Sequence, residues 1–203
     1  MILPLLYAIV LGAAFIIFNI CLFIYTQIYQ DYSMKRNTIS DLGGPEAKTR
    51  KLFNPTVIIM GIILFPFPFF VYQALPQSNF LSLIGIIIFY CVPVGLIMVG
   101  IFPKDKETPH IISALLSFGG LLITNMVLFQ PILFSDLNPI IIIITIIALI
   151  IAIPLLISFS QRDKYEEEEE IKKLFHNLNI WEWVQFIMLQ IWMFSLYINL
   201  LIL

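Results

Sequence analysis

Long apolar tracts without a charged side chain alternate with short charged segments along the 203 residues of this chain. About 20 apolar residues are enough to carry a helix across the roughly 30 Å of hydrocarbon in a bilayer. The charge-free tracts that reach this length are residues 1–30, 52–103, 108–135, 137–161 and 183–203. The pattern therefore predicts helices that span a membrane.

The tract 52–103 is long enough to cross twice, and residues 75–79 (Leu-Pro-Gln-Ser-Asn) place turn formers near its middle. A transmembrane barrel would alternate apolar and polar positions, whereas residues 140–153 are apolar at nearly every position. We therefore expect an all-α protein, a polytopic bundle of six transmembrane helices that forms a single membrane domain over residues 1–203. The expected spans lie near 3–28, 55–75, 80–102, 109–134, 139–159 and 180–203, with inner loops 29–54, 103–108 and 160–179.

Three of the expected helices begin with a capping side chain followed by proline, which suits the first helical position. These pairs are Asn54-Pro55, Thr108-Pro109 and Asn138-Pro139. They predict helix starts at residues 55, 109 and 139.

All 11 Lys and Arg residues fall in the three inner loops. An excess of basic residues marks the cytoplasmic side of a membrane protein, so both termini are expected on the outer side of a multi-pass protein of the cell membrane. The composition, 60% hydrophobic and 12% charged, excludes an ordinary soluble fold. A net charge of −2 without a dense basic face gives no reason to invoke nucleic acid.

Small and polar residues recur at helical spacing inside the spans, and we expect these to line the bundle interior. Helix packing explains such stripes, because small residues let backbones approach closely, and a transport path is the alternative. The span near 139–159 is almost wholly apolar and is expected at the lipid-facing edge. The bundle-lining candidates are Asn19, Ser113, Ser117, Thr124 and Asn125.

Polar residues also gather where the inner loops meet the spans. Together they would form a cluster at headgroup depth, where the first-turn amides of nearby helices favour an anion such as phosphate. Each member also has a local explanation: a turn bond, a lipid contact, a loop cap or a wet helix end. The ligand-binding candidates are Ser40, Asp41, Arg50, Asn54, Asp105 and His110.

Three segments of this region resemble the domain of unknown function 998 family, which comprises six-span prokaryotic membrane proteins. They are Ile39–Gly43 (Ile-Ser-Asp-Leu-Gly), Phe53-Asn54, and Gly100–Asp105 (Gly-Ile-Phe-Pro-Lys-Asp) followed by His110. The resemblance covers nearly the whole chain and implies an architecture, not a reaction. Through Ile-Ser-Asp alone, the chain is more distantly similar to the eukaryotic membrane family of damage-regulated autophagy modulators and a GPI-anchor remodelling factor.

Three classes of function stay open. The leading hypothesis is noncatalytic lipid binding or membrane organisation, with membrane lipid as partner. The second is an enzyme acting on a phospholipid or lipid headgroup, with Asp41, Asp105 and His110 as catalytic candidates and a hard cation on the two carboxylates. The third is a small-solute transporter.

Cofactors and partners are weakly constrained. Only His110 and His176 are available as histidine ligands, which argues against zinc, and neither a metal site nor a cofactor is implied. Gly and Ala pairs permit association with a second copy or another membrane protein.

After the acidic run 166–170, the apolar face of residues 171–178 predicts a helix lying along the interface.

Overall fold

The computed structural model describes residues 3–160 and 177–203, and the regular structure in these ranges is entirely helical. Six helical spans there are long and apolar enough to cross a membrane, which confirms the expected architecture. The first, fifth and sixth spans are α1 (Leu5–Ile28), α8 (Ile140–Ser160) and α10 (Leu178–Ile202). The second span joins α2 (Arg50–Leu64) to α3 (Phe67–Gln73), the third joins α4 (Phe80–Phe89) to α5 (Cys91–Ile101), and the fourth runs through α6 (Glu107–Ala114), the π-helical η2 (Leu115–Gly119) and α7 (Gly120–Leu133).

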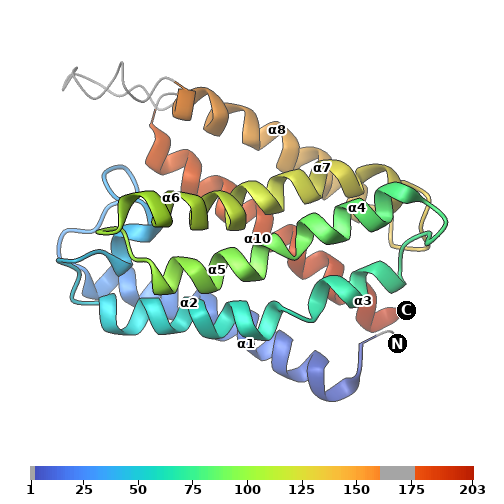
Figure 1. Ribbon diagram of the computed structural model, residues 1–203, viewed down its shortest axis with the longest axis horizontal. Helices are drawn as coiled ribbons and strands as arrows, with labels where there is room; N and C mark the ends of the chain where they lie inside the picture. Colours follow the sequence, from blue (N-terminus) through green and yellow to red (C-terminus); the bar gives the residue numbers. More distant parts are fainter. Residues whose placement is uncertain (1–2, 161–176) are drawn as a thin grey trace.

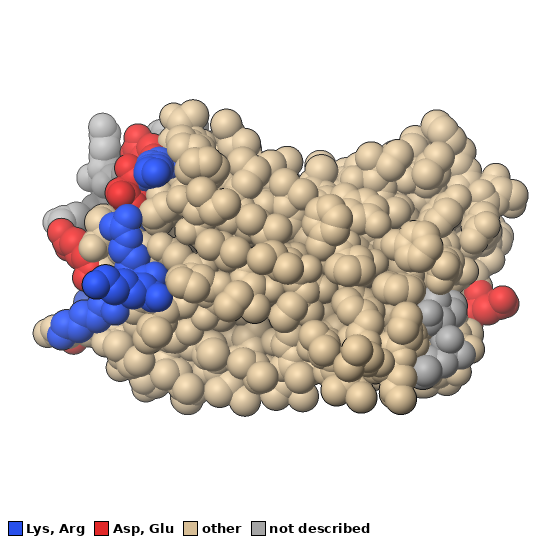
Figure 2. Space-filling view, turned by 60° about the horizontal axis from the view of Figure 1, so that its bottom comes forward, with Lys and Arg blue, Asp and Glu red and all other residues tan. Residues whose placement is uncertain are grey.

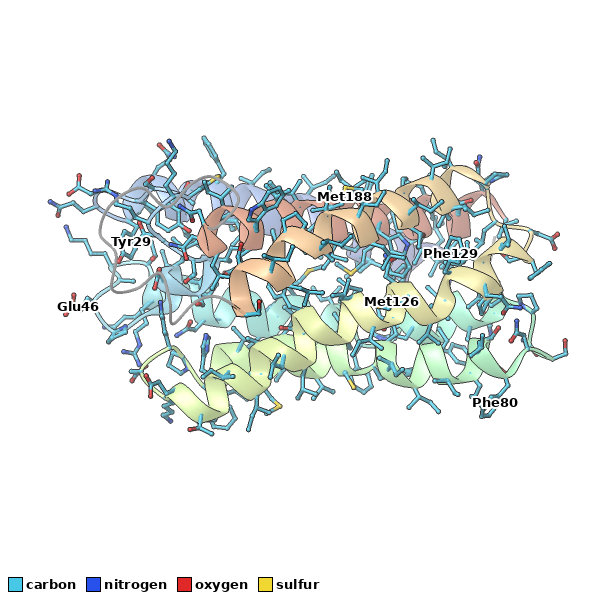
Figure 3. All side chains as sticks on the ribbon, turned by 90° about the horizontal axis from the view of Figure 1, so that it is seen from above. Tyr29, Glu46, Phe80, Met126, Phe129 and Met188 are labelled. Atoms are coloured by element: carbon cyan, nitrogen blue, oxygen red, sulfur yellow. The ribbon has the colours of Figure 1, made fainter. Side chains whose placement is uncertain are left out.

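The spans run side by side along the long axis of the molecule, and both chain termini lie at one end (Figure 1). Tyr29 and Glu46 lie at the opposite end from Phe80 (Figure 3). The end formed by residues 29–49, residues 102–106 and the first turns of α10 is called the basic end below, and the other the terminal end. That the terminal end faces outward stays a prediction. The interfacial helix expected over 171–178 falls mostly outside the described residues.

Two of the three predicted capping pairs are wrong. Helix α2 begins at Arg50, so Pro55 lies inside it, and α6 begins at Glu107 with Lys106 as its N-cap. Both helices extend past the apolar tract because charged first turns are solvated at the membrane surface, where helices need no apolar side chains. The third pair is confirmed as a cap, since the Asn138 side chain accepts from the N–H of Ile140 at 3.0 Å.

The second span is broken between α2 and α3. Pro66 and Pro68 follow Phe65 in close succession and have no N–H to donate, which leaves helix carbonyls without their usual partners. In hydrocarbon such groups must find a partner within the protein. The carbonyls that lose a partner are those of Ile62 and Leu64, and the N–H of Phe65 donates to the carbonyl of Ile62 at 3.3 Å. The hydroxyl of Tyr7 on α1 adds a bond at the same break by donating to the carbonyl of Ile63 at 3.0 Å.

Helix α10 holds the bundle together. Its fully buried Trp192 donates from Nε1 to the Thr145 hydroxyl of α8 at 2.9 Å, and its ring centroid lies 6.0 Å from that of Phe89 on α4. Toward its end, the Tyr197 hydroxyl donates to the carbonyl of Ala8 on α1 at 2.9 Å. Helix α8, by contrast, lies at the edge (Figure 1), and only 22% of its apolar stretch is buried, as its sequence predicts.

The polar stripe of the fourth span faces a neighbouring helix at close range. Ser113, Ser117, Thr124 and Asn125 are all buried, and the three hydroxyls donate to carbonyls of their own span. A Cβ on Gly95 of α5 would lie 2.4 Å from the backbone nitrogen of Ser117, so only glycine lets the two backbones approach this closely. This geometry favours helix packing over a transport path.

Candidate polar site at the basic end

Charge is concentrated at one end of the bundle. Every described Lys and Arg lies within residues 35–51 and 104–106, and Figure 2 shows them gathered at that end. At the terminal end, Asp136 is the only charged side chain within residues 3–160 and 177–203. The candidate ligand-binding residues must therefore be judged by what they contact at the basic end.

Asp41 holds the short helix η1 (Ile39–Gly43) and joins it to another loop. One carboxylate oxygen accepts from the N–H of Thr38 at 2.8 Å, which closes the turn that begins η1. The other oxygen pairs with Nζ of Lys104, in the turn between α5 and α6. Ser40 lies in the same turn as Asp41, with its hydroxyl 3.1 Å from that of Thr38.

Glu182 brings the last helix to the same turn. Its carboxylate accepts from the N–H of Ile39 at 3.0 Å, across 143 positions of sequence. Asp41 and Lys104 are its charged neighbours. Two segments far from η1 in the chain, the α5–α6 turn and the start of α10, therefore converge on it.

Arg50 and Asp105 form a second link between the same loops. The guanidinium of Arg50, in the first turn of α2, donates to both carboxylate oxygens of Asp105 at 3.1 and 3.2 Å. Both side chains are about one-third exposed. An ion pair this exposed contributes about 1 kcal/mol or less to stability, so the guanidinium stays accessible to an anion from outside.

Asn54 and Thr49 join the start of α2 to the end of η1. The Asn54 amide donates to the carbonyl of Gly43 at 3.5 Å, and the buried Thr49 hydroxyl donates to the carbonyl of Leu42 at 2.6 Å. Asn54 thus supports η1 instead of capping α2.

His110 closes the turn between α5 and α6. It is buried, and its Nδ1 lies 2.8 Å from the carbonyl oxygen of Phe102, the C-cap of α5. A carbonyl can only accept, so Nδ1 carries the proton, and in the neutral ring Nε2 keeps its lone pair. The last carbonyls of a helix have no N–H donor within the helix, and His110 supplies a donor to the carbonyl of Phe102.

Aromatic side chains complete the join between α1 and α10. Nε1 of Trp183 donates to the Tyr32 hydroxyl at 3.0 Å, and that hydroxyl donates to the carbonyl of Thr38 at 2.8 Å. Burial raises the pKa of Tyr32 above its usual range, which keeps the hydroxyl protonated and able to donate. Tyr32 and Trp183 therefore also form part of the site.

The structure gathers all six ligand-binding candidates at the basic end, yet as two neighbouring pairs and their supports. Asp41 pairs with Lys104, Arg50 pairs with Asp105, and His110 holds the turn that carries both Lys104 and Asp105. Across the described ranges, no group of three or more His, Cys, Asp or Glu side chains is placed to hold a metal ion. A cation shared by Asp41, Asp105 and His110 therefore gains no support.

Sequence reasoning missed Glu182, Lys104 and Thr49. Glu182 carried a usable signal, because it is the only charge in the last span, and an ionisable residue within a span usually marks a site. Lys104 lies in the motif Gly100–Asp105, but neither it nor Thr49 gave a sign of its partner, since loop lysines and threonines are common and only the fold reveals what they contact.

The fold and the charged end define a polytopic helical membrane protein whose loops are tied together on one side. The model of the DUF998 family, described as protein of unknown function, matches residues 10–199. The chain therefore belongs to this family. No curated protein and no solved structure matches it, so nothing supports the more distant eukaryotic similarity of Ile39–Asp41.

Proposed function

We propose that the basic end binds the headgroups of anionic lipids without chemical change, and so organises lipid around the protein. The observation that carries this proposal is a set of exposed cations on loops that hydrogen bonds and ion pairs hold together. Lys48, Lys51 and Lys106 are exposed, and within the described residues none of them forms an ion pair. A lysine near an anionic membrane surface contributes about 1 kcal/mol to binding.

The surroundings suit a headgroup at a membrane surface. Leu52 follows Lys51 directly and is half exposed, and Ile101 is half exposed just before the turn that carries Lys106. Apolar side chains next to free cations let a lipid place its phosphate on the charge and its chains on the helix. Because the described Lys and Arg residues gather at the basic end, we also infer that the protein resides in the cell membrane with this end in the cytoplasm.

The test measures lipid preference on the purified full-length chain. Native mass spectrometry would compare binding of phosphatidylglycerol and phosphatidylcholine with identical acyl chains. Replacing Lys48, Lys51 and Lys106 together by Gln should reduce the preference for phosphatidylglycerol roughly 100-fold, at about 1 kcal/mol per charge. The matched triple Arg variant keeps the charges and should behave like the parent chain. Equal preference in the Gln and Arg variants would refute the proposal.

A second function, an enzyme acting on a lipid headgroup, is favoured by one observation. The bond from His110 to Phe102 fixes the ring so that Nε2 can accept a proton. Incubation of the parent chain with phosphatidylglycerol and related lipids, followed by product analysis, tests it. The variant His110→Asn keeps a donor near the position of Nδ1 and has no counterpart of Nε2. Turnover by the parent chain that disappears in this variant would support catalysis and contradict simple binding.

A further inference from the structure

A groove opens between α1 and α10, away from the polar site. It has a volume of about 490 Å³. Most of its lining is apolar and exposed, chiefly Ile16, Ile20, Ile187, Ile191 and Phe194. Such a surface is at home in hydrocarbon.

Three polar side chains interrupt this apolar lining. Ser195 is satisfied within its own helix, since its hydroxyl donates to the carbonyl of Ile191 at 2.8 Å. Asn19 is exposed, and one N–H of its amide donates to the carbonyl of Phe15 at 2.8 Å, which leaves its other polar atoms to the groove. Gln190 has a buried side-chain oxygen with no hydrogen-bond partner among the described residues. The position of Asn19 corrects the expectation that it lines the bundle interior.

Both amides lie deep in the hydrocarbon. Asn19 is 14 residues from the start of α1, and Gln190 is 12 residues from the start of α10. At about 1.5 Å per residue, these positions are roughly 21 Å and 18 Å from helix ends on opposite faces of the membrane. Water does not reach this depth, so polar groups there gain by bonding to protein.

We propose that the groove is the contact between two copies of this chain, with the amides of Asn19 and Gln190 hydrogen-bonded across a two-fold axis. The exposed amide of Asn19 keeps an oxygen that can accept, and the N–H groups of Gln190 can donate, so each copy offers the acceptor that its partner's donor needs, as a two-fold contact requires. A lipid chain would cover the isoleucines but would leave the amides unbonded. Polar side chains hydrogen-bonded between helices are a general means of association in membranes.

The test follows dimer formation by the full-length chain in liposomes as the protein-to-lipid ratio is varied. Copies labelled with donor or acceptor dye at Asp136→Cys, in a chain with Cys21 and Cys91 replaced by Ala, report association by energy transfer. The parent chain should dimerise. Asn19→Leu with Gln190→Leu should weaken dimerisation roughly eightfold, since the symmetric contact loses two bonds of ordinary strength for a membrane interior.

A steric pair of variants separates this face from the rest of the surface. Ile16→Trp fills the groove and should prevent dimerisation, whereas Ile59→Trp on α2, at a residue equally exposed to lipid, should leave it intact. A parent chain that stays monomeric at every ratio would overturn the proposal. So would unchanged dimerisation in both the double Leu variant and Ile16→Trp, or a partner protein or lipid found in the groove in place of a second copy.

Discussion

The carboxylate of Glu182 accepts a hydrogen bond of 3.0 Å from the backbone N–H of Ile39. The last helix thereby holds the first inner loop of the chain. Because η1 also pairs with Lys104 through Asp41, this bond is one of the contacts that close the basic end.

Removal of the Glu182 acceptor should loosen that end. Glu182→Leu leaves the Ile39 N–H without a partner and is expected to lower the free energy of unfolding by about 1–3 kcal/mol. Glu182→Gln keeps an acceptor oxygen and should lower it by less. Unfolding of the purified protein by SDS titration, followed by helix content, measures both. Equal losses in the two variants would show that the charge, and not the acceptor, matters.

The pair of Asp41 and Lys104 should contribute little energy by itself. Lys104 is nearly half exposed, and exposed ion pairs are worth about 1 kcal/mol or less. A double-mutant cycle with Asp41→Asn and Lys104→Met should therefore give a coupling of at most about 1 kcal/mol. A much larger coupling would show that the membrane surface shields the pair from water.

His110 should be replaceable by a residue that donates at the same place. His110→Asn can keep the donor to the Phe102 carbonyl, whereas His110→Ala removes it and should destabilise the protein by about 1 kcal/mol. Thermal unfolding in detergent tests the difference. Were His110→Asn as unstable as His110→Ala, the bond to Phe102 would not be the reason for this histidine.

Two glycines in neighbouring spans should respond in opposite ways to alanine. Gly95→Ala forces a Cβ against the backbone of Ser117 and should cost about 1–3 kcal/mol. Gly119 has no atom within 4 Å of an added Cβ, so Gly119→Ala should be neutral or stabilise the helix by up to about 1 kcal/mol. The same unfolding assay compares them, with Gly119→Ala serving as the control for helix propensity.

The two ends of the bundle should react with reagents on opposite sides of the membrane. Lys48→Cys and Asp136→Cys, both at exposed positions, would be introduced separately into a chain without Cys21 and Cys91. An impermeant maleimide should label Asp136→Cys in intact cells and Lys48→Cys only after lysis, because basic loops stay in the cytoplasm. The reverse pattern would invert the predicted orientation.

The sequence was sufficient for the number of spans and the class of fold. Charged side chains are excluded from hydrocarbon, so the distances between Asp, Glu, Lys and Arg limit where a helix can cross. The same rule was weak at helix ends, since Arg50 and Glu107 begin helices in the solvated surface region, where charge is tolerated.

The site required the tertiary structure. Asp41, Asp105 and His110 were identified from their motifs, but nothing in the motifs pairs them with Lys104, Arg50 and the Phe102 carbonyl. Ile39 and Glu182 are separated by nearly the whole chain. The cost of burying a charge acts on each residue separately, so the sequence alone predicts where charged side chains can lie. A hydrogen bond depends on two groups that only the packing of the helices brings together.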